Sequence, residues 1–193
     1  MDMLRYEVKG KDNLFIKGVQ CIMESVFAEY AARGHYYTER IINVLVLSEM
    51  TLPECYTFCI QHKVIPDIVF CSEACQRVFE HTTMFMNTTF INVMTSPAAA
   101  KVTILAALSR NAIQPELLRR QDLCQSLGYK DSLFVDRYSR GTTISMIAIR
   151  EQRSVKSVYA QYKKLANLIG VATRQEFAVK SMMISRYSRN LLN

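Results

Sequence analysis

The sequence lacks an apolar run long enough to cross a membrane, and it lacks glycine-rich linkers, low-complexity tracts and internal repeats. A membrane-spanning helix needs roughly 18 apolar residues, whereas the longest apolar run of interest, Ile41 to Leu47, is interrupted by Asn43. The first residues also lack the basic segment and the following apolar region of a secretory signal. These absences predict a cytoplasmic protein that has no membrane partner.

Histidine is scarce as well, and the three histidines, His35, His62 and His81, lie in unrelated sequence contexts. No nucleophile–base spacing, phosphate-binding loop or cluster of metal ligands stands out along the chain. The sequence therefore predicts a protein that is not an enzyme, with no catalytic residues, no cofactor and no metal.

The six cysteines include two pairs spaced four residues apart, Cys55 with Cys59 and Cys71 with Cys75. This spacing places each pair on one helical face, where four thiolates could hold a zinc ion. It differs from the two-residue spacing of zinc knuckles, so reduced thiols, several of them buried, are the favoured interpretation. A regulator that senses a ligand or a redox change through its first domain stays open as an alternative.

Charge is distributed unevenly along the chain. Residues 109–193 contain 15 lysines and arginines against six acidic residues, a net charge of +9. Residues 1–108 contain nine against eleven, a net charge of −2. A polyanionic partner for the C-terminal part follows from electrostatics, and a merely solvated basic surface is the alternative that charge alone leaves open.

The N-terminal part alternates amphipathic stretches with short apolar runs. The expected strands are 41–47, 66–70 and 90–94, with a weaker fourth near 6–8, and the expected helices are 13–30, 52–61, 73–81 and 97–108. Short apolar strands that alternate with helices are typical of a parallel sheet covered on both faces. We therefore predict a truncated, doubly wound α/β domain over residues 1–108.

The C-terminal part is predicted to be all-α, with four helices over 127–193 after a linker over 109–126 that holds a short helix at 115–125. Hydroxyl side chains that cap helices and glycines that stop them mark the helix ends. These boundary residues are Ser132 and Gly141 for the first helix, Thr143 for the second, Ser154 for the third and Thr173 for the fourth.

The second and third of these helices are short and are joined by a tight turn, and the third helix is basic. This pattern is typical of a helix-turn-helix, whose second helix enters the major groove of DNA. The third helix is expected to turn its apolar face inward, with Val155, Val158, Tyr162 and Leu165. Its other face offers cationic and amide side chains suited to phosphates and base edges: Lys156, Tyr159, Gln161, Lys163 and Lys164. A generic helical bundle with a basic face is the alternative.

A series of residues at fixed spacings runs through 127–179. The series consists of Leu127, Lys130-Asp131, Gly141, Thr143, Ile147-Ala148, Ser154-Val155-Lys156-Ser157-Val158, Gly170-Val171 and Arg174-Gln175-Glu176. In this order and spacing the segment resembles the LuxR-type helix-turn-helix of NarL/FixJ-class response regulators. Three departures mark a diverged scaffold: Lys130-Asp131 replaces Arg-Glu, Glu151 replaces a normally buried leucine, and Leu168-Ile169 replaces Lys-Leu.

The resemblance implies which side chains meet DNA. Those implied to face the bases are Tyr159, Ala160 and Lys163, and those implied to lie nearer phosphates are Lys156, Ser157, Gln161 and Lys164. Thr143 and Arg153 complete the predicted DNA-binding set. For each residue a plain interpretation stays open, since a surface lysine is usually only solvated and Tyr159 could instead pack beside Arg153.

The N-terminal domain resembles a shortened receiver. Receivers hold Mg²⁺ with paired acids after the first strand, attach phosphate to an Asp ending the third, and place a Lys after the fifth. Here only Asp12 is left of the acidic pair, Ser48 stands at the phosphoacceptor position, and Thr95-Ser96 stands where the Lys is expected. The receiver's second strand and helix are expected to be missing, because residues 33–40 are too few to form them. Since serine cannot form an acyl phosphate, we predict a pseudo-receiver without conventional phosphorylation or a Mg²⁺ site.

These features together predict a DNA-binding transcriptional regulator that binds double-stranded DNA as a homodimer or as a heterodimer with a related regulator. The helix at 97–108 is a candidate dimer interface through Val102, Ile104, Leu105 and Leu108, with burial in the core as the alternative. The resemblance to orphan or auxiliary LuxR-type regulators of enteric bacteria implies control of surface structures such as fimbriae or capsule. The competing hypothesis, favoured by Glu151, is a protein-interaction module that pairs with another regulator without reading DNA.

Overall fold

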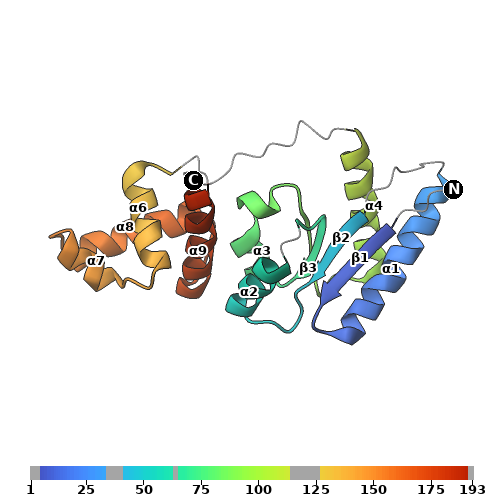
Figure 1. The fold of residues 1–193 in the computed structure, drawn as a ribbon, viewed down its shortest axis with the longest axis horizontal. Helices are drawn as coiled ribbons and strands as arrows, with labels where there is room; N and C mark the ends of the chain where they lie inside the picture. The colour runs from blue at the N-terminus through green and yellow to red at the C-terminus, as the bar shows by residue number, and fades with distance from the viewer. Residues whose placement is uncertain (1–4, 34–40, 63–64, 114–126, 191–193) are drawn as a thin grey trace. The chain divides into compact units, whose positions relative to one another are not determined.

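A computed structural model describes residues 5–33, 41–62, 65–113 and 127–190 of the chain (Figure 1). The chain divides into two compact units. The sheet unit comprises Met1–Glu73 and Asn87–Arg119, and the helical unit comprises Ala74–Met86 and Arg120–Asn193.

The sheet unit is built on four parallel strands in the order β1 (Arg5–Gly10), β2 (Ile41–Val46), β3 (Ile68–Cys71) and β4 (Thr89–Asn92). The weak strand expected near 6–8 is therefore a full edge strand, paired with β2 along its length. A receiver has the order 2-1-3-4-5. Removing its second strand leaves the order observed here. The predicted gap at 33–40 falls on residues 34–40, which lie outside the described residues.

Two helices, α1 (Asn13–Ala32) and α4 (Pro97–Ile113), pack side by side over one face of the sheet (Figure 1). Alternate residues of a strand point to the same face, and the core between the sheet and these helices uses that alternation. Its buried members are Ile42, Val44, Val46, Ile68, Phe70 and Ile91 from the strands and Val19, Met23, Val26, Tyr30, Ala100, Ile104, Leu105 and Leu108 from the helices.

The helix α4 is longer than the sequence predicts. The expected end at Leu108 and a polar connection from Ser109 are wrong, because the helix continues to Ile113. Ser109 donates its hydroxyl proton to the carbonyl of Leu105 at 2.9 Å, so its polar group is satisfied inside the helix. The remainder of the predicted linker, including the helix at 115–125, lies outside the described residues.

Of the four candidate interface residues of α4, three are buried in the core and one is exposed. Ile104, Leu105 and Leu108 are buried in the core, whereas Val102 is 67% exposed. As dimer contacts, Ile104, Leu105 and Leu108 are wrong, because all three pack against the sheet and α1.

On the other face of the sheet, α2 (Leu52–His62) buries Cys55, Phe58 and Cys59. Burial raises the pKa of the Cys59 thiol to about 12, and the neighbouring Cys55 and Cys71 add to the shift. A thiol with such a pKa stays protonated at neutral pH, and a protonated thiol is a poor nucleophile. Among the described residues, no three histidine, cysteine or acidic side chains are grouped to hold a metal ion.

The helical unit contains α6 (Tyr129–Ser139), α7 (Ile144–Arg150), α8 (Val155–Leu168) and α9 (Arg174–Asn190). The first of them begins at Tyr129 rather than at the expected Ser132. Helix α6 packs on α9, and α7 packs on α8 (Figure 1). Their shared core is aromatic, with Tyr138 and Tyr162 both edge-to-face on Phe177, at centroid distances of 4.9 and 4.8 Å. Aromatic pairs in such arrangements stabilise a core beyond the area they bury.

The helical unit also includes most of α3 (Glu73–Phe79) and the 3₁₀ turn η1 (Thr83–Phe85). The Arg77 guanidinium makes a bidentate pair with the carboxylate of Glu176, with N–O distances of 3.0 and 3.2 Å. The Lys180 ammonium donates to the carbonyl of Arg77 at 2.6 Å. Burial alone would raise the pKa of Glu176, but Arg77 and the N–H of Ala172 hold that pKa below its ordinary value. These polar contacts fix α3 against α9.

Candidate nucleic-acid interface

Helices α7 and α8 have the lengths and caps of a helix-turn-helix. Thr143 caps α7 by accepting the N–H of Met146 at 3.3 Å, and Ser154 caps α8 by accepting the N–H of Ser157 at 3.1 Å. Both caps are the residues that the sequence predicts. Gln152 lies in the turn between the helices with a φ of 53°, the left-handed conformation that reverses the chain in few residues.

Helix α8 buries apolar side chains on one face and exposes its lysines on the other, although Val155 and Leu168 at its two ends are also exposed. Val158, Tyr162 and Leu165 are buried, as predicted. The predicted inward position of Val155 is wrong, because this first residue of the helix is 52% exposed. The predicted DNA-facing residues lie mainly on the outside. Those exposed on α8 are Lys156, Ser157, Tyr159, Ala160, Lys163 and Lys164; Gln161 is half-buried, and Thr143 and Arg153 are exposed before the helix. The helix contains three lysines and no acidic residue. Its outer face is therefore cationic and open to solvent.

Not all the predicted contact residues are equally available. Arg153 donates to Gln161 at 2.7 Å, to Glu151 at 2.8 Å and to the hydroxyl of Ser157 at 3.1 Å. Gln161 in turn donates to Asp131 of α6 at 3.1 Å. Arg153, Ser157 and Gln161 thus form one intramolecular network across the turn and α8, whereas none of the three lysines of α8 is paired with an acid of the described residues.

Glu151, the departure at a normally buried leucine, is accommodated by this network. Its carboxylate accepts from Arg137 of α6 at 2.5 Å and from Arg153 at 2.8 Å, and its side chain is 24% exposed. A carboxylate between two guanidinium groups is charge-compensated, so it can replace an apolar contact without leaving an unpaired charge. The replacement therefore gives no reason to consider the helix-turn-helix defective.

Tyr159 lies on the outer face of α8 and is 37% exposed. Its ring stacks on Tyr162, with centroids 5.8 Å apart and an interplanar angle of 23°. Two cations lie over the ring, the Lys163 Nζ at 5.4 Å and the Arg174 Cζ at 5.9 Å from its centroid. Sequence reasoning missed Arg174 as a surface residue of this region, because it belongs to the next helix.

In the sheet unit, Ser48 follows β2 at the carboxyl edge of the sheet, where parallel α/β domains place their sites. Ser48 is 6% exposed, and its hydroxyl donates to the Asp12 Oδ2 at 3.4 Å. The other oxygen of Asp12 caps α1 by accepting the N–H groups of Leu14 and Phe15, both at 3.0 Å. Asp12, the acid predicted from the resemblance to a receiver, therefore caps α1 and accepts the hydrogen bond of Ser48.

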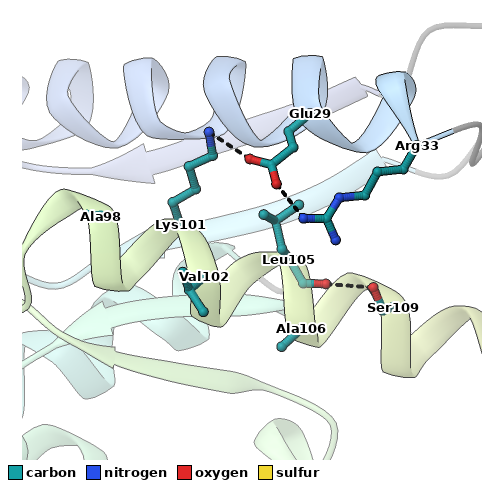
Figure 2. A pocket seen from close by; sticks show the side chains of 8 residues that line it. All are labelled: Glu29, Arg33, Ala98, Lys101, Val102, Leu105, Ala106 and Ser109. Carbon is teal, nitrogen blue, oxygen red and sulfur yellow. Dashed lines mark hydrogen bonds and ion pairs between the residues drawn. The ribbon is translucent and has the colours of Figure 1, made fainter.

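An open groove of about 500 Å³ runs between α1 and α4 (Figure 2). Figure 2 shows Lys101 and Arg33 both reaching Glu29, and the Lys101 Nζ lies 2.9 Å from a Glu29 oxygen. Val102 and Ala106 line the groove beside these charges. The face therefore combines both signs of charge with a small apolar patch.

Within the residues that the structure describes, no helix is both long and apolar enough to span a bilayer. A comparison of the sequence with protein-family models gave no match, and neither did a comparison with curated proteins.

Solved structures do match. The two-component response regulator RcsB in its DNA complex is 13% identical, with a TM-score of 0.57 over 93% of this chain and 98% of that chain. RcsB from Salmonella enterica serovar Typhimurium, bound to the promoter P1flhDC in the presence of phosphomimetic BeF3-, is 13% identical with a TM-score of 0.57, over 95% of this chain and 99% of that chain. The chain thus shares the fold of these two RcsB structures, with a parallel sheet domain followed by an all-helical domain that contains a helix-turn-helix. This confirms the predicted fold class.

Proposed function

We propose that the protein is a sequence-specific, DNA-binding transcriptional regulator that reads duplex DNA through α7 and α8. The observation that carries this proposal is the outer face of α8, which presents Tyr159 and three exposed lysines that form no ion pair with an acid of the described residues. Lysines on such a face neutralise phosphates and release counterions, and side chains near the middle of the helix reach base edges. The similar fold of RcsB, solved as a DNA complex, supports the same use of the fold.

We propose further that regulation does not depend on phosphorylation of the sheet unit. Ser48 replaces the phosphoacceptor, and a hydroxyl gives a phosphate ester rather than the labile acyl phosphate of a receiver. Asp12, the one acid beside it, caps α1 and accepts the serine proton. The two groups are thereby engaged in holding the domain together.

The proposed assembly is a dimer, a homodimer or a heterodimer with a related regulator, in which two helix-turn-helix domains bind two half-sites. The α1–α4 face is the proposed contact between copies, because charges of both signs, those of Glu29, Lys101 and Arg33, border a small exposed apolar patch there. Val102, 67% exposed between them, supplies an apolar centre. Val102→Glu should shift the mass measured by light scattering from dimer to monomer; an unchanged mass contradicts this face.

The experiment that tests DNA binding is a fluorescence anisotropy titration of a short duplex at a series of salt concentrations. Each phosphate contact contributes about 0.9 to the slope of log K against log salt. Lys163→Gln should weaken binding and lower that slope, whereas the control Lys17→Gln removes an exposed charge of α1 and should change neither. A binding constant that does not respond to salt contradicts the proposal, and Lys163→Ala without effect on activity would instead indicate a protein-interaction module.

The most specific part of the proposal concerns which genes the protein regulates. The resemblance to auxiliary LuxR-type regulators extends it to surface structures such as fimbriae or capsule. Genome-wide mapping of the DNA bound by the intact protein gives the operator and the target genes together. Bound sites confined to unrelated operons contradict this part and leave the DNA-binding function intact.

A further inference from the structure

Two arginines lie beside α8, and the structure uses them differently. Arg153, in the turn before the helix, donates hydrogen bonds to Glu151, Gln161 and Ser157. Arg174, at the start of α9, lies over the ring of Tyr159 with its Cζ at 5.9 Å from the ring centroid. A guanidinium that lies over an aromatic ring interacts with it through its positive charge. Its N–H donors point outward in the guanidinium plane and stay available for hydrogen bonds.

The position of Arg174 is fixed by its helix end. Thr173 accepts the N–H of Glu176 at 3.1 Å, and the Glu176 carboxylate accepts the N–H of Ala172 at 2.8 Å. Together these bonds resemble a capping box, which defines where a helix begins. Arg174 is therefore the first residue of a well-capped helix, and its exposed side chain extends from there along the edge of α8.

Tyr159 is held on that edge from several directions. Its ring stacks on the buried Tyr162, and Lys163 and Arg174 both lie over it, yet it is still 37% exposed. An aromatic side chain fixed in this way loses little conformational freedom when it meets a base. The two cations beside it keep N–H donors for phosphates on either side of that base.

We propose that Arg174, rather than Arg153, supplies the arginine contact to DNA, and that it acts with Tyr159 as one unit at the edge of the recognition helix. The guanidinium of Arg174 donates to a backbone phosphate, and by covering the ring it orients Tyr159 toward a base edge. This inference rests on the proposed function and adds to it a contact residue that comes from outside the helix-turn-helix.

The test is anisotropy with a random-sequence duplex, at several salt concentrations, on the full chain. Arg174→Gln should weaken binding several-fold and lower the salt slope by about 0.9, the value of one lost phosphate contact. Lys17→Gln, a matched loss of one exposed positive charge, should leave both unchanged. A far-ultraviolet circular dichroism melt checks that each variant is folded.

The joint action is tested with Tyr159→Leu and the double variant. If the two residues act as a unit, the double variant should lose less affinity than the sum of the two single losses in log K. Strictly additive losses overturn the unit, and an unchanged salt slope in Arg174→Gln overturns the contact while Lys163→Gln still reports DNA binding. If the unmodified chain itself binds no duplex, the proposed function fails first.

Discussion

The sheet unit and the helical unit use their polar side chains in opposite ways. In the sheet unit, the two residues at the carboxyl edge of the sheet bind each other: Asp12 caps α1 and accepts a hydrogen bond from the hydroxyl of Ser48. In the helical unit, a network around Glu151 fixes the turn, and the lysines of α8 stay exposed. The first unit thus satisfies these polar groups internally, whereas the second leaves a positively charged surface open to solvent. The split in charge, −2 over residues 1–108 and +9 over 109–193, follows the same division.

The largest expected effect concerns the one buried ammonium of the described residues, Lys180. Burial lowers its pKa from 10.5 to about 8, although Glu80 and Glu176 nearby act in the opposite direction. Between pH 8 and 10.5 the unfolded chain holds more protons than the folded one, so the free energy of unfolding should rise with pH. At 1.36 kcal/mol per pKa unit, the gain across this window is about 3 kcal/mol.

Urea unfolding at a series of pH values from 7 to 10 measures this gain. Lys180→Met removes the titrating group, so its unfolding free energy should depend less on pH than that of the unmodified chain. Lys164→Met, an exposed lysine of α8, is the matched control and should keep the original dependence. Equal pH dependence in the Lys180 variant and its control would show that this ammonium is not buried as described.

A second, smaller effect sharpens the contrast between the engaged Arg153 and the exposed lysines. Glu151→Gln removes the carboxylate that holds Arg137 and Arg153. Losing two charge-assisted bonds should lower the unfolding free energy by about 1–2 kcal/mol. Arg153 keeps its bonds to Gln161 and Ser157, but its positive charge is no longer neutralised by this carboxylate. DNA affinity should therefore increase, and the salt slope should become steeper by at most about 0.9.

Urea denaturation and fluorescence anisotropy on the same preparation measure the loss in unfolding free energy and the gain in DNA affinity. Glu54→Gln, which removes an exposed acid of the sheet unit, is the control for the change in net charge. If both variants strengthen DNA binding equally, the gain comes from net charge alone and the network does not restrain Arg153.

The smallest effect is expected at Ser48, the residue proposed to replace a phosphoacceptor. Ser48→Ala removes one hydrogen bond to a carboxylate that keeps its own N–H donors, so the unfolding free energy should fall by about 1 kcal/mol. DNA affinity should not change. Incubation with a small phosphate donor should leave the intact mass of the unmodified protein unchanged, and a stable gain of one phosphate would contradict the assignment of the sheet unit as a pseudo-receiver.

Local patterns were sufficient to predict most of the fold. The apolar runs ending at Leu47 and Phe70 gave the strands, and Thr143 and Ser154 gave the starts of α7 and α8 because capping depends on neighbours in sequence. The end of α4 could not be predicted in this way. Ser109 looks like the first residue of a polar loop, and only its bond back to Leu105 shows that the helix goes on.

The candidate site was predictable to the extent that it lies on one helix. The exposed lysines of α8 follow from helical spacing, since residues on one face recur at three and four positions. The engagement of Arg153 depends on Asp131 and Gln161, which are far apart in sequence and meet through Gln161 only after folding. Arg174 lies beside Tyr159 for the same reason, because the packing of α9 decides it.

The different burial of the cysteines makes their reactivity a probe of local opening of the structure. Cys21 is exposed, whereas Cys55, Cys59 and Cys71 are enclosed between α2 and the sheet and Cys75 is buried in α3. A thiol reagent will modify Cys21 quickly and reach the enclosed sulfurs only during transient opening. The modification rate of each enclosed cysteine, followed by peptide mass, therefore reports how often its part of the structure opens, without any label added to the chain.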